Sequence, residues 1–292
     1  MDETYVAVFL DSALSKGNLL APLSLLILFF ARFLPIIALS PFFGSKVLPN
    51  PVKLMFALTM FAIFLPKLLL VTTTPLDFNP QLILLLVKEM FVGICMGFII
   101  SMPFMIVQSA GILIDHQRGG ASLMINDPTI QNQSSPIGTL FNLVLIFIFF
   151  FVNGPFLFID VIITSYDVIP PDQYINPAFF DKNTAFWQMQ IGLLNKMMVT
   201  TMRLCSPAIL CILMTDVFLG IANRLAPQVQ ITFLGMPLKS LFALAIVCIG
   251  WNLFAAELVK LSYTWIDNVA EMLKMFKSTE VLPPLVTPML SN

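Results

Sequence analysis

Two stretches of the chain carry one pattern, Pro51-Val52-Lys53-Leu54-Met55-Phe56-Ala57-Leu58 and Pro237-Leu238-Lys239-Ser240-Leu241-Phe242-Ala243-Leu244. Proline, lysine, phenylalanine, alanine and leucine recur in register, and each stretch begins ten residues after the proline of a Leu-x-Pro motif. Because each copy joins two long apolar segments, we interpret the repeat as a helix-loop-helix unit of a membrane protein. A chance similarity between two apolar hairpins is the alternative. The motif positions are Pro41, Gly44, Pro51 and Lys53 in the first copy and Pro227, Gln228, Pro237 and Lys239 in the second.

The composition separates this chain from soluble domains. Apolar residues make up 58% of the sequence and charged residues only 11%, whereas about a quarter of the residues in a soluble domain are charged. The net charge of −1 gives no reason to expect a nucleic-acid partner. The four cysteines lie in apolar stretches without a CxxC pair, and the common nucleotide-binding, metalloprotease and serine-hydrolase motifs are absent from the sequence. We therefore expect no cofactor, no metal and no enzymatic activity.

Six apolar segments follow one another along the chain, at residues 19–40, 52–71, 82–115, 137–166, 190–222 and 236–266. Each exceeds the roughly 18 apolar-rich residues that a membrane-spanning helix needs. The intervening stretches are rich in proline and glycine or polar, and all are too short for a soluble domain. We predict an all-α membrane protein with one helical domain at 1–266 and an amphipathic to Pro-rich C-terminal tail at 267–292.

Several of these segments are unusually long or contain proline. As one helix, segment 82–115 would be about 50 Å long, against a hydrocarbon core of ~30 Å. Segments three, four and five contain Pro103, the Gly154-Pro155 pair and Pro207. Because proline removes a helix hydrogen bond, we predict kinked or broken helices or hairpins that pack on protein. Tilted helices with protruding ends are the alternative.

Charged residues within apolar runs indicate surfaces that do not face lipid. A central Arg or Asp costs about 2.5 to 3.5 kcal/mol on insertion, so such residues mark protein contacts or functional sites. A GxxxG motif, which permits close helix packing, follows one of them on the same helix face. The residues that we single out for buried charge and packing are Arg32, Glu89, Gly93, Gly97, Asp115, Arg118, Arg203, Asp216 and Arg224. The alternative is that these charged side chains snorkel to the membrane surface or form isolated ion pairs, such as Glu257 with Lys260.

The loop after the third segment is the most distinctive of the chain. Its glycine pair permits a sharp turn, and an apolar stretch with small flanking residues follows. Such a loop could fill a pore and move, while an ordinary surface loop with one hydrophobic contact is the alternative. The residues concerned are Gly119, Gly120, Ala121, Ser122, Leu123, Met124, Ile125, Asn126, Asp127 and Pro128.

Several short motifs follow one another in the order of a known family. They are Pro41-Phe42-Phe43-Gly44-Ser45 leading to Pro51-Val52-Lys53, Glu89-x-x-x-Gly93-x-x-x-Gly97-Phe98, Asp115-x-Gln117-Arg118-Gly119, Ser135-Pro136-x-Gly138-x-Leu140-Phe141, Asp216-x-x-Leu219-Gly220, and Arg224-x-Ala226-Pro227-Gln228 running to Met236-Pro237-Leu238-Lys239. In this succession the chain resembles the export-gate proteins of type III secretion, called SctT in injectisomes and FliR in flagella. The stretches Asp115–Gly120 and Pro237–Lys239 resemble the injectisome branch more than the flagellar one.

The resemblance implies a non-enzymatic subunit of an export gate in the bacterial inner membrane, partly within the secretion basal body. With SctR-like and SctS-like sister subunits, and beside a SctU-like subunit, it would form a closed helical pore for unfolded secreted proteins. In that family a loop of this subunit plugs the pore, and Gly119–Pro128 match the position of that loop.

Two other functions fit the same residues. A secondary transporter of a small solute also has broken helices, charges at mid-membrane and an internal repeat. It would be a monomer or a simple homo-oligomer with a saturable solute flux. A membrane-embedded enzyme or assembly scaffold without a pore is favoured if the charges only pair with one another.

Overall fold

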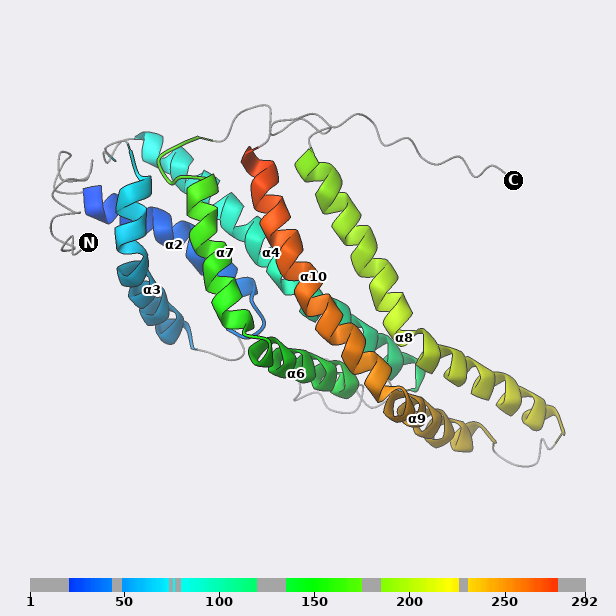
Figure 1. Cartoon of the computed structure of the whole chain (residues 1–292). Helices are drawn as coiled ribbons and strands as arrows, with labels where there is room; N and C mark the ends of the chain where they lie inside the picture. The colour runs from blue at the N-terminus through cyan, green and yellow to red at the C-terminus, as the bar shows by residue number, and fades with distance from the viewer. Residues whose placement is uncertain are drawn as a thin grey trace, which may run out of the picture. The chain divides into compact units, whose positions relative to one another are not determined.

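The computed structural model describes residues 21–43, 49–73, 76, 80–119, 135–174, 185–225 and 231–277. Eight helices lie within these residues and are coloured in chain order in Figure 1. They are α2 (Ala21–Leu39), α3 (Asn50–Val71), α4 (Pro80–Gln117), α6 (Pro136–Phe151), α7 (Gly154–Val168), α8 (Ala185–Leu225), α9 (Ile231–Ile249) and α10 (Trp251–Lys277). The described ranges contain no strand, so the predicted all-α fold is confirmed.

The chain divides into two compact units. The first unit comprises Met1–Ser101, Pro155–Gly192 and Trp265–Asn292, and the second comprises Met102–Gly154 and Leu193–Thr264. The first therefore contains α2, α3, nearly all of α7 and the N-terminal half of α4. The second contains α6, α9, the C-terminal part of α4, most of α8 and the N-terminal half of α10.

The helix ends follow from local sequence signals. Pro51 lies in the first turn of α3, where its missing N–H leaves no helix hydrogen bond unmade. The last turn of α3 is closed by Thr72, whose hydroxyl donates to the carbonyl of Leu68 at 2.7 Å. Helix α6 begins at a cap, because the Ser135 hydroxyl accepts from the N–H of Gly138 at 2.9 Å.

The break that the sequence predicts in the fourth apolar segment is confirmed. Helix α6 ends at Phe151, and Asn153 then adopts a φ of 58°, a left-handed conformation that asparagine tolerates at helix ends. Helix α7 starts immediately afterwards, with Pro155 in its first turn. A second bent pair, which the sequence analysis did not predict, is formed by α9 and α10, where the chain bends by 64° at Gly250 (Figure 1).

The third and fifth apolar segments are each one continuous helix, so no break occurs at Pro103 or Pro207. Without its own N–H, Pro207 cannot donate to the carbonyl of Arg203, four residues earlier. The hydroxyl of Ser206 donates to that carbonyl instead, at 3.1 Å. This local hydrogen bond helps α8 to accommodate its interior proline without ending.

The core of the first unit is aromatic. Phe29 of α2 lies at the centre, with ring centroids at 5.0 Å from Phe33, 5.9 Å from Phe64 of α3 and 6.1 Å from Tyr166 of α7. Such ring pairs add about 0.5–1.5 kcal/mol each to the burial of their area. The α2, α3 and α7 helices are thus held together by a continuous group of rings.

The glycines of the GxxxG motif bring α4 against α2 within the first unit. A side-chain carbon added at Gly93 would overlap the backbone of Arg32, and one added at Gly97 would lie 3.1 Å from the Cα of Ile36. In the second unit, Gly111 of α4 lies equally close to the backbone of α6 at Gly138. Small residues therefore permit backbone contact at two places along α4.

The two copies of the repeated pattern lie in different units. The first copy connects α2 to α3, and the second connects α8 to α9. Helix α9 begins six residues before Pro237, so this proline lies inside a helix, whereas Pro51 lies at a helix start. Gly44, Pro227 and Gln228 lie outside the described residues.

Among the residues that the structure describes, four helices are long and apolar enough to cross a membrane, namely α2, α3, α4 and α8, and the number rises to six if each bent pair counts as one span. This agrees with the six apolar segments of the sequence and identifies a multi-pass membrane protein. Helix α10 extends to Lys277, so residues 267–277 of the predicted tail are helical.

The Gly93 contact generates the first prediction. Replacing Gly93 with Ala would push α4 away from the backbone of α2, which cannot move as a side chain can. We expect the purified chain to lose about 1–3 kcal/mol of unfolding free energy in a detergent titration. Gly220→Ala is the matched control, because a side-chain carbon there meets nothing within 4 Å. Equal stability of the two variants would contradict the close approach of α4 and α2.

Candidate functional site

A buried guanidinium lies at the centre of the first unit. Arg32 of α2 and Glu89 of α4 are both 0% exposed and form a two-point ion pair. The second contact of this pair joins Arg32 Nη2 to Glu89 Oε1 at 2.8 Å. The planar guanidinium fits a carboxylate in this way, which fixes both the distance and the angle between the two side chains.

The remaining donors of Arg32 reach α7. Its Nη1 donates to the Ser165 hydroxyl at 3.0 Å, and its Nη2 donates to the carbonyl of Ile169 at 2.7 Å. The guanidinium carbon also lies 4.1 Å from the centre of the Tyr166 ring. Because the last carbonyls of a helix carry a partial negative charge, a cation at this end is favourable. Arg32 therefore joins α2, α4 and α7 through one side chain.

A second cation, Lys88, completes the network. Its Nζ lies 2.6 Å from Glu89 Oε1 and donates to the carbonyls of Pro170 and Gln173 at 2.8 and 3.0 Å. The same turn carries Asp172, whose carboxylate accepts from the backbone N–H and the hydroxyl of Thr73 at 2.9 and 3.0 Å. Two cations and two carboxylates thus share the buried site, so their formal charges cancel.

The second unit has its own buried carboxylate. Asp115 is 1% exposed, and its Oδ2 accepts from the Ser135 hydroxyl and from the N–H of Ile137, the latter at 2.9 Å. Both donors lie at the N-terminus of α6, where a negative charge is favoured by the helix dipole. Asp115 therefore fastens the last turn of α4 to the first turn of α6.

Arg118 connects this carboxylate to α9. Its Nε donates to Asp115 Oδ1 at 2.6 Å, and its Nη1 donates to the Ser240 hydroxyl at 3.0 Å. Gly119 follows with a φ of 94°, which favours glycine. The other residues of the predicted plug, Gly120–Pro128, lie outside the described residues.

A further ion pair joins α8 and α9. Lys239, from the second copy of the repeat, pairs with Asp216 beside a cavity of about 320 Å³. Asn223 and Gly235 are among the other residues that line this cavity. The corresponding lysine of the first copy, Lys53, is buried in α3.

The two remaining charges that the sequence singles out lie on the surface of the single chain. Arg203 and Arg224 of α8 are both exposed. Glu257 is also exposed, and no ion pair with Lys260 forms in the part of the chain that the structure describes. Among the described residues, no group of three or more His, Cys, Asp or Glu side chains could hold a metal.

Sequence reasoning missed several members of these networks. A lysine next to a buried carboxylate is expected to pair with it. The position of Lys88 beside Glu89 in the sequence could therefore have identified it. The turn at 169–173 contains the turn signal Pro170-Pro171, but the sequence does not show that its backbone carbonyls accept from Arg32 and Lys88. Ser240 lies in the second copy of the repeat, but the first copy has Leu54 at that position.

The first network generates the second prediction. Glu89→Met would leave two buried cations without their shared carboxylate, and we expect a loss of about 3–5 kcal/mol in unfolding free energy. The double variant Arg32→Met with Glu89→Met removes the Arg32 cation together with its Glu89 partner. We therefore expect it to regain much of the unfolding free energy that Glu89→Met alone loses. Lys67→Ala is the control: its pair with Asp167 is exposed, and we expect a loss below about 1 kcal/mol. Equal losses in the single and double variants would contradict the pairing.

Comparisons with known proteins agree with the motifs. The family described as bacterial export proteins, family 1, matches residues 23–264. The secretion system apparatus protein SsaT of Salmonella typhimurium is 32% identical over 173 residues, which cover 57% of this chain and 62% of SsaT. The flagellar biosynthetic protein FliR of Bacillus subtilis is 30% identical over 227 residues, which cover 77% of this chain and 85% of FliR.

The Yop proteins translocation protein T of Yersinia pestis is 31% identical over 163 residues, covering 56% of this chain and 60% of that protein. The matched stretches therefore span less than two thirds of SsaT and of the Yersinia protein, and most of FliR. Since the family match covers most of the sequence, the chain belongs to the bacterial export proteins, family 1, the family of SctT and FliR.

Proposed function

We propose that this chain is a non-enzymatic subunit of a type III secretion export gate in the bacterial inner membrane. With SctR-like and SctS-like subunits, and beside a SctU-like subunit, it forms a closed helical pore through which unfolded proteins pass. The family membership and the names of its relatives support this role, since they are secretion apparatus and flagellar biosynthetic proteins.

The observation that carries the proposal is the apolar surface of α8. Only 22% of its apolar window is buried within the chain, and large exposed side chains follow one another from Leu194 to Leu225. These two positions are about 46 Å apart along a helix that rises ~1.5 Å per residue, whereas the hydrocarbon core is ~30 Å thick. Lipid tails cannot cover all of this surface if the helix stands upright. Neighbouring protein subunits can.

The stem of the 119–134 loop supports the plug assignment. Asp115 holds the chain on both sides of the loop, because it binds Arg118 before it and Ser135 after it. A loop whose two ends are fastened to one carboxylate emerges from a fixed place in the fold. We propose that Gly119–Pro128 occupies the pore and that the apolar stretch Ala121–Ile125 fills its lumen.

The third prediction concerns the companions of the chain. After mild detergent extraction from its host, the chain should migrate in a complex far heavier than 32.6 kDa and contain other apolar membrane proteins, as mass spectrometry would show. Met214→Lys places a charge on the exposed face of α8 and should release the companions. Tyr174→Lys, an exposed position in the turn after α7, should leave them bound. A lone chain with a saturable solute flux would instead favour a secondary transporter.

The fourth prediction concerns the plug. Deleting Gly119–Ile125 should make the inner membrane permeable to ions, measured by the loss of membrane potential in cells that still assemble the complex. A deletion of equal length within residues 278–292 is the control and should leave the potential unchanged. An intact potential in the loop variant would remove the plug assignment without affecting the assignment of the chain to the gate.

A further inference from the structure

The second unit contains a cavity of about 300 Å³ that all five of its helices line. It lies where two irregularities meet, the bend between α9 and α10 at Gly250 and the interior proline of α8, Pro207. Ala208 of α8 and Phe141 of α6 form part of its wall. Its size reaches the lower end of the range of small-molecule sites, which is about 300–1,000 Å³.

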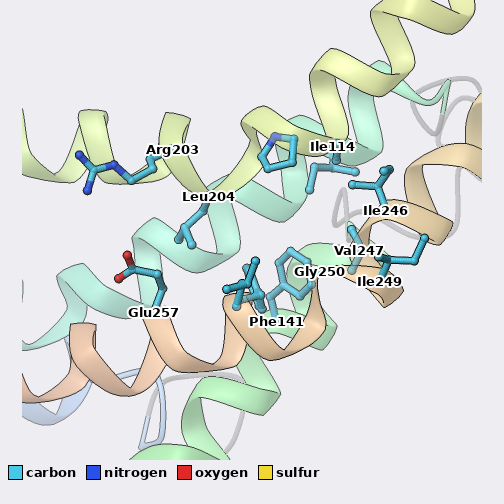
Figure 2. A pocket seen from close by; sticks show the side chains of 13 residues that line it. Ile114, Phe141, Arg203, Leu204, Ile246, Val247, Ile249, Gly250 and Glu257 are labelled. Carbon is cyan, nitrogen blue, oxygen red and sulfur yellow. The ribbon is translucent and has the colours of Figure 1, made fainter.

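The cavity has a charged end and an apolar end. In Figure 2, Arg203 of α8 and Glu257 of α10 lie toward one side, while Ile246, Val247 and Ile249 of α9 lie toward the other. A cavity with one charged end and one apolar end matches an amphiphile, which has a charged head and an apolar tail.

The two charges at this end have opposite sign and are not used within the chain. Both side chains are exposed, and neither forms an ion pair or side-chain hydrogen bond among the residues that the structure describes. An uncharged partner would leave both groups unmatched. A ligand that carries an anion and a cation close together would match both.

The length of α8 permits a polar head at this place. The helix has 41 residues and is about 60 Å long at ~1.5 Å per residue, twice the ~30 Å of the hydrocarbon core. Arg203, although near the middle of the helix, can therefore lie at the level of the lipid headgroups. Long cationic side chains favour that level.

We propose that this cavity binds one membrane phospholipid of the phosphatidylethanolamine type. The guanidinium of Arg203 binds the phosphate, and the carboxylate of Glu257 binds the ammonium group. Part of one acyl chain fills the cavity, and the exposed side chain of Leu253 on α10 continues the apolar surface beside it. This site is independent of the export role.

The test uses the full chain in vesicles of phosphatidylethanolamine and phosphatidylglycerol. A trace of phosphatidylethanolamine with a photoreactive acyl chain is added, and the cross-linked peptides are identified after irradiation. We expect labelling of α9 and α10 around Ile246–Leu253. Ala208→Phe should fill the cavity and lower this labelling at least tenfold. Arg203→Gln and Glu257→Gln should each lower it several-fold and reduce the preference over photoreactive phosphatidylglycerol.

Matched controls separate the site from general lipid contact. Met214→Phe adds an aromatic ring on α8 outside the cavity, and Arg224→Gln removes an exposed arginine of the same helix, so both should be labelled like the wild type. If Ala208→Phe does not fold, Arg203→Gln and Glu257→Gln test the proposal in its place, since these two variants change only exposed side chains. Unchanged labelling in both charge variants would overturn the proposal. So would a cross-link from a partner subunit at Ile246–Leu253 of the extracted complex, with lipid excluded.

Discussion

The guanidinium of Arg32 is fully buried, so its N–H donors need acceptors within the protein. Glu89, Ser165 and the carbonyl of Ile169 supply these acceptors from α4 and from α7 and the residue after it, while the aromatic ring of Tyr166 lies over the guanidinium. The close approach of α2 to α4 at a glycine, the ring cluster and the turn that follows α7 all lie around this side chain. The first unit is arranged around that requirement.

The second unit uses a carboxylate for a similar purpose. Asp115 closes the start of α6 and, through Arg118 and Ser240, reaches α9. In both units a charge that would be costly in lipid connects helices that are distant in sequence. A buried ion pair is weak evidence for added stability, because desolvation offsets its attraction. Its clearer contribution is to fix which helices are neighbours and at what distance.

Much of this arrangement follows from the sequence. Apolar length predicted the helical segments, and the charges within them pointed to Arg32, Glu89 and Asp115, which the structure buries. The bend at Gly250 was missed because a single glycine in an apolar run gives no directional signal. Pro103 and Pro207 suggested kinked or broken helices, but α4 and α8 are continuous through these prolines. At Pro207 the hydroxyl of Ser206 donates to the carbonyl that the proline leaves without a partner. Arg203 and Arg224, which their place in apolar runs marked as buried, are exposed in the structure.

In an export-gate subunit, the apolar surface of α8 must be covered by protein beyond the bilayer. Single cysteines at Leu194, Leu210 and Leu225 of a cysteine-free chain, treated with a membrane-impermeant maleimide, test it directly. In the extracted complex all three positions should react far more slowly than a cysteine at Tyr174, and the two end positions should become reactive when the companions are removed. Rapid labelling of both end positions in the intact complex would contradict the account.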